Sequence, residues 1–148
     1  MIRFSSAGRG CPGRYNFNGR KPSVRISRKR FEELVRTAAA AVMRSLPDDL
    51  KEKAGDLVFT AEEIAEPGRS EDGDDEDLLG LYEGTPLPAR SIDQPFTGHD
   101  HITLFRVPLA EMCRDERELR EEIRLTILHE LGHFFGFDED ELEKRGLG

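Results

Sequence analysis

The sequence predicts an α+β domain in which two amphipathic helices cover a small sheet. Apolar residues recur every three to four positions over residues 27–46 and 115–135, which is the period of a helix with one buried face. Three short segments, 57–60, 78–82 and 102–107, are rich in β-branched, aromatic and leucine residues and read as strands. We therefore expect a sheet of at least three strands whose apolar surface is covered by the two helices.

The composition fits one soluble domain with a modest core. The chain has 148 residues, of which 36% are hydrophobic and 35% are charged. No apolar run approaches the roughly 20 residues that span a bilayer, and the N-terminus lacks the hydrophobic stretch of a signal peptide. We expect a cytoplasmic protein with no membrane partner, in which Cys11 and Cys113 are unbridged thiols rather than zinc ligands.

Residues 1–26 show no sustained helical or strand period, and we predict a flexible segment ahead of a single domain at 27–148. Charge divides near this boundary. Residues 1–30 carry nine Lys or Arg and no acid, whereas residues 31–148 carry thirteen Lys or Arg and thirty Asp or Glu. The basic arm could contact nucleic acid electrostatically or fold back on its own acidic domain, and a misplaced start of the chain is a third account.

The first helix begins near Ser27, and its apolar stripe predicts a face buried in the core. Pro47 ends the pattern because proline cannot continue a helix. The stripe consists of Phe31, Leu34, Val35, Ala38, Val42, Met43 and Leu46. Residues 47–53 are expected to add one or two further turns of helix, and the acidic run at 71–77 is expected to be a solvated loop.

The second helix combines a packing face with a polar face. Asp115 and Glu118 have the spacing of a capping box at its start, and Gly136 can adopt the left-handed turn that ends a helix. At about 100° per residue, the apolar side chains gather on one side, while His129 and His133 fall on the other. The apolar set is Ile123, Ile127, Leu128, Leu131, Phe134 and Phe135.

Residues 129–133 form the motif His-Glu-x-x-His. On a helix, residues i and i+4 lie on one face, so His129 and His133 can direct both imidazoles at one zinc ion. Glu130 is rotated by about 100° from His129 and can take a proton from the water that the metal activates. The alternative interpretation is an exposed helix whose two histidines bind nothing.

A third zinc ligand is expected shortly after the helix. Glu139 lies ten residues after His129, at the offset where zincins with a glycine-containing extension of the motif place their third ligand. Asp138 and Asp140 are alternatives, and most of the acidic run 138–141 is expected to be solvated. We predict Glu139 as the third ligand.

The stretch from His129 to Glu139 resembles the motif of the minimal zincins, a bacterial family of small metallopeptidase-like proteins. Three further stretches are similar to that family, namely 78–87, 101–109 and the helix start near 27–34. The resemblance implies a minimal zincin-like α+β fold, with a small mixed sheet of about three strands, a backing helix and the metal-binding helix. It covers about residues 24 to 144.

This resemblance implies a zinc-dependent metallopeptidase that hydrolyses peptide bonds, with Zn²⁺ at His129, His133 and a downstream acid and with Glu130 as general base. The family more often has Asp at the position of Glu139, so the identity of the third ligand is open. The substrate would be a peptide or protein that pairs with a strand edge beside the metal. A zinc-binding regulatory or interaction domain with little turnover is the alternative, because so short a chain has little surface for specificity pockets.

Three residues outside the motif have a functional alternative. Tyr82, in the second predicted strand, could donate a hydrogen bond to a developing oxyanion or be an ordinary half-buried strand tyrosine. His99 and His101 are spaced like a metal-binding pair but are expected to be surface residues, since the zinc ligands are already supplied.

Overall fold

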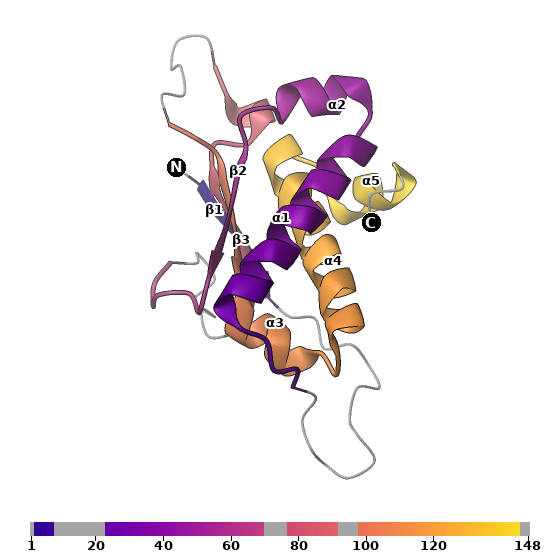
Figure 1. The fold of residues 1–148 in the computed structure, drawn as a ribbon. Coiled ribbons are helices and arrows are strands. Elements are labelled where there is room, and N and C mark those ends of the chain that lie inside the picture. The colour runs from indigo at the N-terminus through magenta and orange to yellow at the C-terminus, as the bar shows by residue number, and fades with distance from the viewer. Residues whose placement is uncertain (1, 8–22, 70–76, 92–97, 146–148) are drawn as a thin grey trace.

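The computed structural model describes residues 2–7, 23–69, 77–91 and 98–145, and for residues 2–7 and 139 it describes the backbone alone (Figure 1). The helices are α1 (Arg28–Ser45), α2 (Asp48–Lys53), α3 (Arg106–Met112), α4 (Glu116–Phe135) and α5 (Glu139–Lys144). The strands are β1 (Ile2–Ala7), β2 (Val58–Glu62), β3 (Leu78–Gly84) and β4 (His101–Phe105). The predicted α+β class is confirmed, and α1 and α4 lie side by side on one face of the sheet (Figure 1).

Four strands of the described chain form one mixed sheet in the order β1-β3-β4-β2. β2 runs parallel to β4, whereas β3 runs antiparallel to β4 on one side and to β1 on the other. The register places Tyr82 of β3 opposite Ile102 of β4 and opposite Phe4 of β1. The outer edge of β3 is therefore covered by the first strand of the chain.

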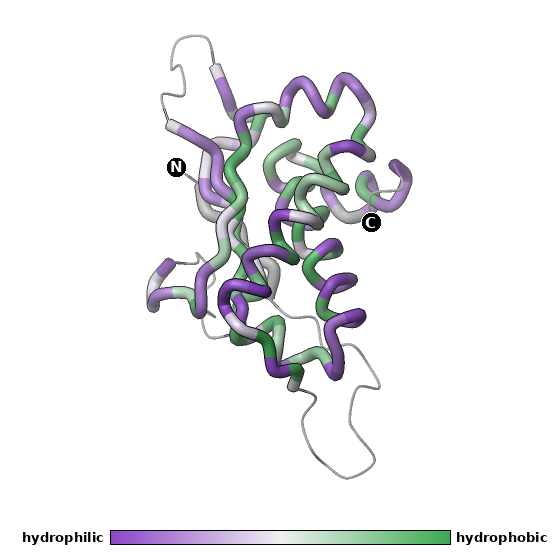
Figure 2. Tube along the Cα trace, in the orientation of Figure 1, coloured by the Kyte–Doolittle hydropathy of each residue, from purple (hydrophilic) through white to green (hydrophobic). Residues whose placement is uncertain are grey.

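The main hydrophobic core lies between the sheet and the helices α1 and α4. Figure 2 shows hydrophobic residues running along the strands and recurring along α1 and α4 between hydrophilic ones, as the helical period predicts. A smaller cluster forms on the other face of β3, where side chains alternate. It consists of Ala65, Leu78, Leu81 and Phe105. Both faces of the central strands are thus packed.

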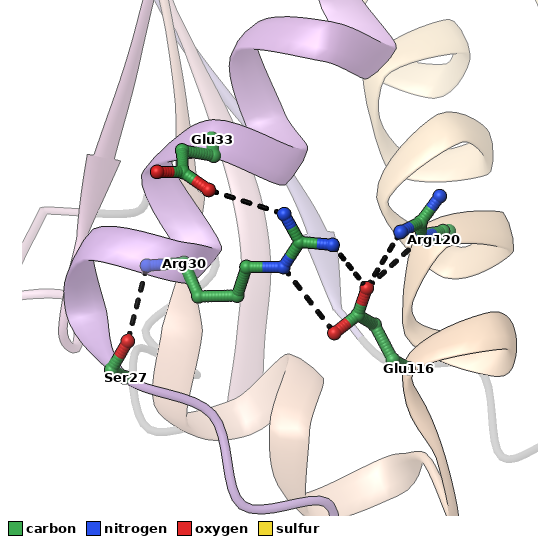
Figure 3. Close-up of polar contacts among 5 residues, drawn as sticks. All are labelled: Ser27, Arg30, Glu33, Glu116 and Arg120. Carbon is green, nitrogen blue, oxygen red and sulfur yellow. Dashed lines mark hydrogen bonds and ion pairs between the residues drawn. The ribbon is translucent and has the colours of Figure 1, made fainter.

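An ion-pair network joins α1 to the start of α4 (Figure 3). Arg30 Nη2 lies 2.6 Å from Glu116 Oε1, and the same guanidinium bonds Glu33 within α1. Arg120, one turn further along α4, also donates to Glu116. These hydrogen bonds, that from Arg30 first, lower the pKa of Glu116 to about 2. The network links the two helices at their N-terminal ends, but its side chains remain partly exposed, so its contribution to stability is small.

The ends of the long helices follow their predicted signals. Ser27 Oγ accepts the Arg30 N–H as the N-cap of α1, and Asp115 caps α4 by accepting the Glu118 N–H at 2.9 Å. The predicted capping box at Asp115 is only half formed, because the Glu118 carboxylate accepts the N–H of Arg114 instead. Gly136 ends α4 with φ of 75°, in the left-handed region that glycine adopts without strain.

The structure differs from the sequence-based expectation in the sheet. The three predicted strands are present as β2, β3 and β4, but β1 adds a fourth within the segment expected to be flexible and without a strand period. Predicted strand residues Arg106 and Val107 belong to α3, because the chain turns into a helix directly after Phe105. The acidic run at 71–76 lies outside the described residues.

Past α4, the acidic run opens the short helix α5, and Asp138, Asp140 and Glu141 are exposed, as expected of a solvated run. Asp138 is its N-cap and forms a complete capping box with Glu141. Leu142 of α5 packs on Gly132 of α4, where an added Cβ would lie 2.5 Å from a Leu142 methyl carbon. This close contact holds α5 against α4.

The structure describes one of the two cysteines. Cys113 follows α3 directly, ahead of α4, and has none of its surface exposed, whereas Cys11 lies outside the described residues. Among the residues that the structure describes, no helix has both the length and the hydropathy needed to cross a membrane.

Candidate metal centre

His129 and His133 meet near the C-terminal end of α4. Their Nε2 atoms are 3.0 Å apart, and the two rings make an edge-to-face contact with centroids 4.7 Å apart. Both side chains are half-buried, while the neighbouring Leu128 and Leu131 are buried in the core. The helix therefore packs through one face and directs two imidazole nitrogens to one point on another, as the spacing predicted.

The geometry of the two imidazoles fits a zinc ion. Zinc binds imidazole nitrogen at about 2.0–2.1 Å, and two such ligands in a tetrahedron lie about 3.3 Å apart. The observed separation of 3.0 Å between the Nε2 atoms needs only a small rotation of either ring to reach that distance. His129 and His133 can thus supply two nitrogen ligands without movement of the backbone.

The electrostatic environment favours the form of histidine that binds metals. Burial, with a smaller contribution from the adjacent His129 that disfavours a second positive charge, lowers the pKa of His133 to about 4. Metal ligation requires neutral imidazole with an available lone pair. At neutral pH His133 is in that form.

Glu130 is fixed between α4 and β3. Its side chain has no exposed surface, and its Oε2 accepts the backbone N–H of Tyr82 at 3.0 Å. Gly80, two residues earlier in β3, permits this approach, since a Cβ there would lie 2.5 Å from Thr126 Cγ2 and 3.4 Å from Glu130 Cγ. The carboxylate predicted as the base is therefore held in one orientation by the sheet.

Tyr82 belongs to a buried polar network beside this carboxylate. Its hydroxyl donates to Asp100 Oδ1 at 2.6 Å, and Asp100 Oδ2 accepts from Arg90 Nη2 at 2.5 Å. Burial, reinforced by the bond to Asp100, raises the pKa of Tyr82, so the phenol stays protonated. Tyr82 is completely buried, so the expectation of a half-buried residue is wrong, and its phenol is committed to Asp100.

Arg90 connects this network to α4. Its guanidinium lies 5.5 Å from the ring centroid of Phe134, the residue after His133, and its Nε donates to the carbonyl of Thr85. Sequence reasoning missed both Arg90 and Asp100. Each lies far from the motif in sequence and carries no local signal, because the network exists only once the loop after β3 folds back over α4.

The described residues do not identify the third ligand. Asp138 uses Oδ1 to cap α5 and is exposed, and Asp140 is also exposed. Glu139 is the first residue of α5, but its side chain lies outside the description. Within the described part of the chain, no group of three His, Cys, Asp or Glu side chains could hold a metal. Glu139 therefore stays a prediction. Of the two histidines expected on the surface, His99 is exposed and His101 is half-buried.

Comparisons with known proteins place the chain in a family. The sequence model of a family described as zincin-like metallopeptidase matches residues 54–147, which include β3, β4 and all of α4. A search of curated proteins found no significant match. A solved structure of a conserved hypothetical protein from "Thermo thermophilus" is similar with 23% identity and a TM-score of 0.49, over 74% of this chain and 94% of that one. The family match covers more than half of the sequence, and the chain belongs to the zincin-like metallopeptidase family.

Proposed function

We propose that this protein is a zinc-dependent peptidase in which His129 and His133 bind the metal and Glu130 acts as general base. The observation that carries the proposal is the convergence of two imidazole nitrogens, 3.0 Å apart, from residues that flank a buried carboxylate oriented by the backbone of β3. Membership of the zincin-like metallopeptidase family supports the same reaction class. A metal site that only stabilises the fold would not need an oriented carboxylate at this position.

The residues divide the chemistry between them. Zinc held by the two histidines would supply a Lewis acid that polarises a peptide carbonyl and activates water. Glu130 accepts the proton of the attacking water and delivers it to the departing amine. The bond from the Tyr82 N–H fixes one carboxylate oxygen, so the base keeps its orientation while it gains and loses the proton.

The third ligand is proposed to be Glu139, at the start of α5. The contact of Leu142 with Gly132 and the backbone bond from Phe137 N to the Gly132 carbonyl hold the start of α5 next to the end of α4. Replacing Glu139 by Ala should weaken zinc binding, whereas Asp140→Ala should leave the zinc affinity unchanged. Zinc titration of the two variants measures this difference.

Metal content and turnover together test the function. The purified parent should contain close to one zinc per chain, and His129→Ala should lose it, while His99→Ala, a change at an exposed histidine, should keep it. Glu130→Gln preserves the shape of the side chain and its bond from Tyr82, so it should keep the zinc. That variant should cleave a mixture of quenched fluorescent peptides about 10²- to 10⁴-fold more slowly than the parent.

The possible failures have different meanings. A parent that binds no zinc even after the metal is added back would refute the metal site and the peptidase together. Zinc bound through His129, but with no peptide cleavage by either parent or Glu130→Gln, would support the alternative of a zinc-binding interaction domain. Equal cleavage by both proteins would show that Glu130 is not the base.

A further inference from the structure

Strand β3 contacts the candidate catalytic base. Tyr82 of β3 bonds the Glu130 carboxylate through its N–H, and a Cβ at Gly80 would contact the same side chain. The inner side of β3 is taken by β4, and β2 lies at the far end of the sheet. An extended peptide that reaches Glu130 by strand pairing must therefore use the outer edge of β3.

That edge is occupied by the chain itself. β1 runs antiparallel to β3, with Phe4 opposite Tyr82, which bonds Glu130, and Ser6 opposite Gly80, where an added Cβ would meet the Glu130 side chain. α4 packs against β1 as well as β3. The backbone of residues 2–7 thus takes the path of an added strand directly beside the base.

β1 is not part of the domain that defines the family. The family match begins at residue 54 and includes β2, β3 and β4, whereas β1 lies more than forty residues upstream and pairs with β3 alone. Removing β1 from the sheet leaves the β3-β4-β2 order and the contact of α1 with α4 intact. A strand attached at one edge and outside the matched domain can be exchanged for another strand of similar shape.

We propose that β1 is an intramolecular competitor that occupies the β3 edge and excludes an extended peptide substrate from the metal centre. The proposal rests on the proposed peptidase function for the identity of the competing ligand. A tethered strand acts at an effective concentration in the millimolar range, so a free peptide competes poorly with it. Displacing β1 should open the edge without altering the histidines or Glu130.

Peptide binding tests the proposal without any need for turnover. The probe is a fluorescent peptide with the sequence of residues 2–7, Ile-Arg-Phe-Ser-Ser-Ala, measured by anisotropy in EDTA. A variant that lacks residues 2–7 should bind this probe at least about tenfold more tightly than the full chain. In the zinc-loaded protein the same deletion should raise the rate of peptide cleavage by a similar factor.

A matched pair of full-length variants tests whether the effect requires β1 to pair with β3 or only requires residues 2–7 to be present. Successive N–H groups of a strand point to opposite sides, so replacing both Phe4 and Ser5 by proline removes at least one donor to β3. This double-proline variant should bind the probe like the deletion. The corresponding double-alanine variant keeps both N–H groups and should bind it as weakly as the full chain.

A disulfide lock tests the same contact in one protein. Arg3 and Glu83 are direct partners in the register, so the pair Arg3→Cys and Glu83→Cys, in a Cys11→Ser background, can bridge β1 to β3. The oxidised protein should not bind the probe, and reduction should restore the weak binding of the parent. Probe binding that is equal in the full chain, the deletion, the double-proline variant and the oxidised lock would overturn the proposal.

The two proposals fail in different ways. Loss of zinc binding or of cleavage refutes the peptidase but leaves the difference in probe binding in EDTA untouched. Conversely, if the zinc-loaded protein cleaves peptides at the same rate with and without residues 2–7, then β1 does not compete with the substrate. That result refutes the role of β1 but not the peptidase function.

Discussion

The close approach of α4 to β3 at Gly80 makes a quantitative prediction. A Cβ at this position would lie 2.5 Å from Thr126 Cγ2, well inside the optimal carbon–carbon separation of about 3.5–4.0 Å. Overpacking of a tight core costs about 1–3 kcal/mol, and replacing a strand glycine by alanine returns about 0.5–1 kcal/mol. Gly80→Ala should therefore lower the free energy of unfolding by about 1–2 kcal/mol.

A compensating change identifies the clash as the cause. Thr126→Ser removes the obstructing methyl group and should cost about 1 kcal/mol by itself, since that methyl is buried. In the double variant, the Cβ added at position 80 takes the space of the methyl group removed at position 126. The cost should be about 0–1 kcal/mol rather than the sum of about 2–3 kcal/mol for the two single changes, which corresponds to a coupling free energy of about 1–3 kcal/mol.

Urea unfolding followed by circular dichroism measures these differences. Excess EDTA removes any contribution of bound metal to stability. Gly55→Ala is the matched control, because its Cβ would meet only the Glu52 carbonyl oxygen at 3.4 Å, and its stability should be unchanged or slightly higher. Full stability of Gly80→Ala, or strict additivity in the double variant, would refute the argument that Gly80 lets α4 approach the sheet.

Three further predictions concern the ends of the helices and the network that joins them. Arg30→Gln should raise the pKa of Glu116 from about 2 toward 4.5, as carboxyl NMR can measure. A carboxyl group whose pKa is lowered in the folded state stabilises the fold at pH values above its unfolded-state pKa, and this contribution is lost as the pH falls. The variant should therefore lose less stability than the parent between pH 4.5 and about 2. An unchanged pKa of Glu116 in the variant would contradict the network. Asp115→Ala should lower the free energy of unfolding by about 0.5–2 kcal/mol, and Asp115→Asn, which can still cap, by much less; equal losses would exclude capping. Gly136→Ala should lower the thermal unfolding midpoint more than Gly68→Ala. Both glycines have left-handed backbones, but only a Cβ at position 136 would meet Pro88, at 2.5 Å. Equal shifts of the midpoint would mean that the contact with Pro88 adds no cost.

Sequence alone predicted the features that depend on local spacing. α1 and α4 follow from the helical period and their caps, and the meeting of His129 with His133 follows from an i, i+4 pair on a regular helix. The orientation of Glu130 by β3 could not be predicted, because it depends on a contact 48 residues away in the chain.

Non-local pairing also explains the two missed elements. In residues 2–7 apolar and polar residues alternate only from Ile2 to Ser5, which is too short a run to predict a strand, and the segment forms one where it pairs with the edge of β3. In α3 the early residues Val107 and Pro108 imitate the end of a strand, yet proline is tolerated in the first turn of a helix, where its missing N–H is not needed. The buried network of Tyr82, Asp100 and Arg90 likewise comes from three separate segments.

The reactivity of the Cys113 thiol can report local opening of the protein around the junction between α3 and α4. With no exposed surface, it can react with an alkylating reagent only when the junction between α3 and α4 opens. In a Cys11→Ser background, the alkylation rate divided by that of an exposed thiol gives the population of the open state, provided that closing is faster than reaction. The labelling kinetics of one atom would then report how firmly the helix that carries both histidines is anchored at its first turn.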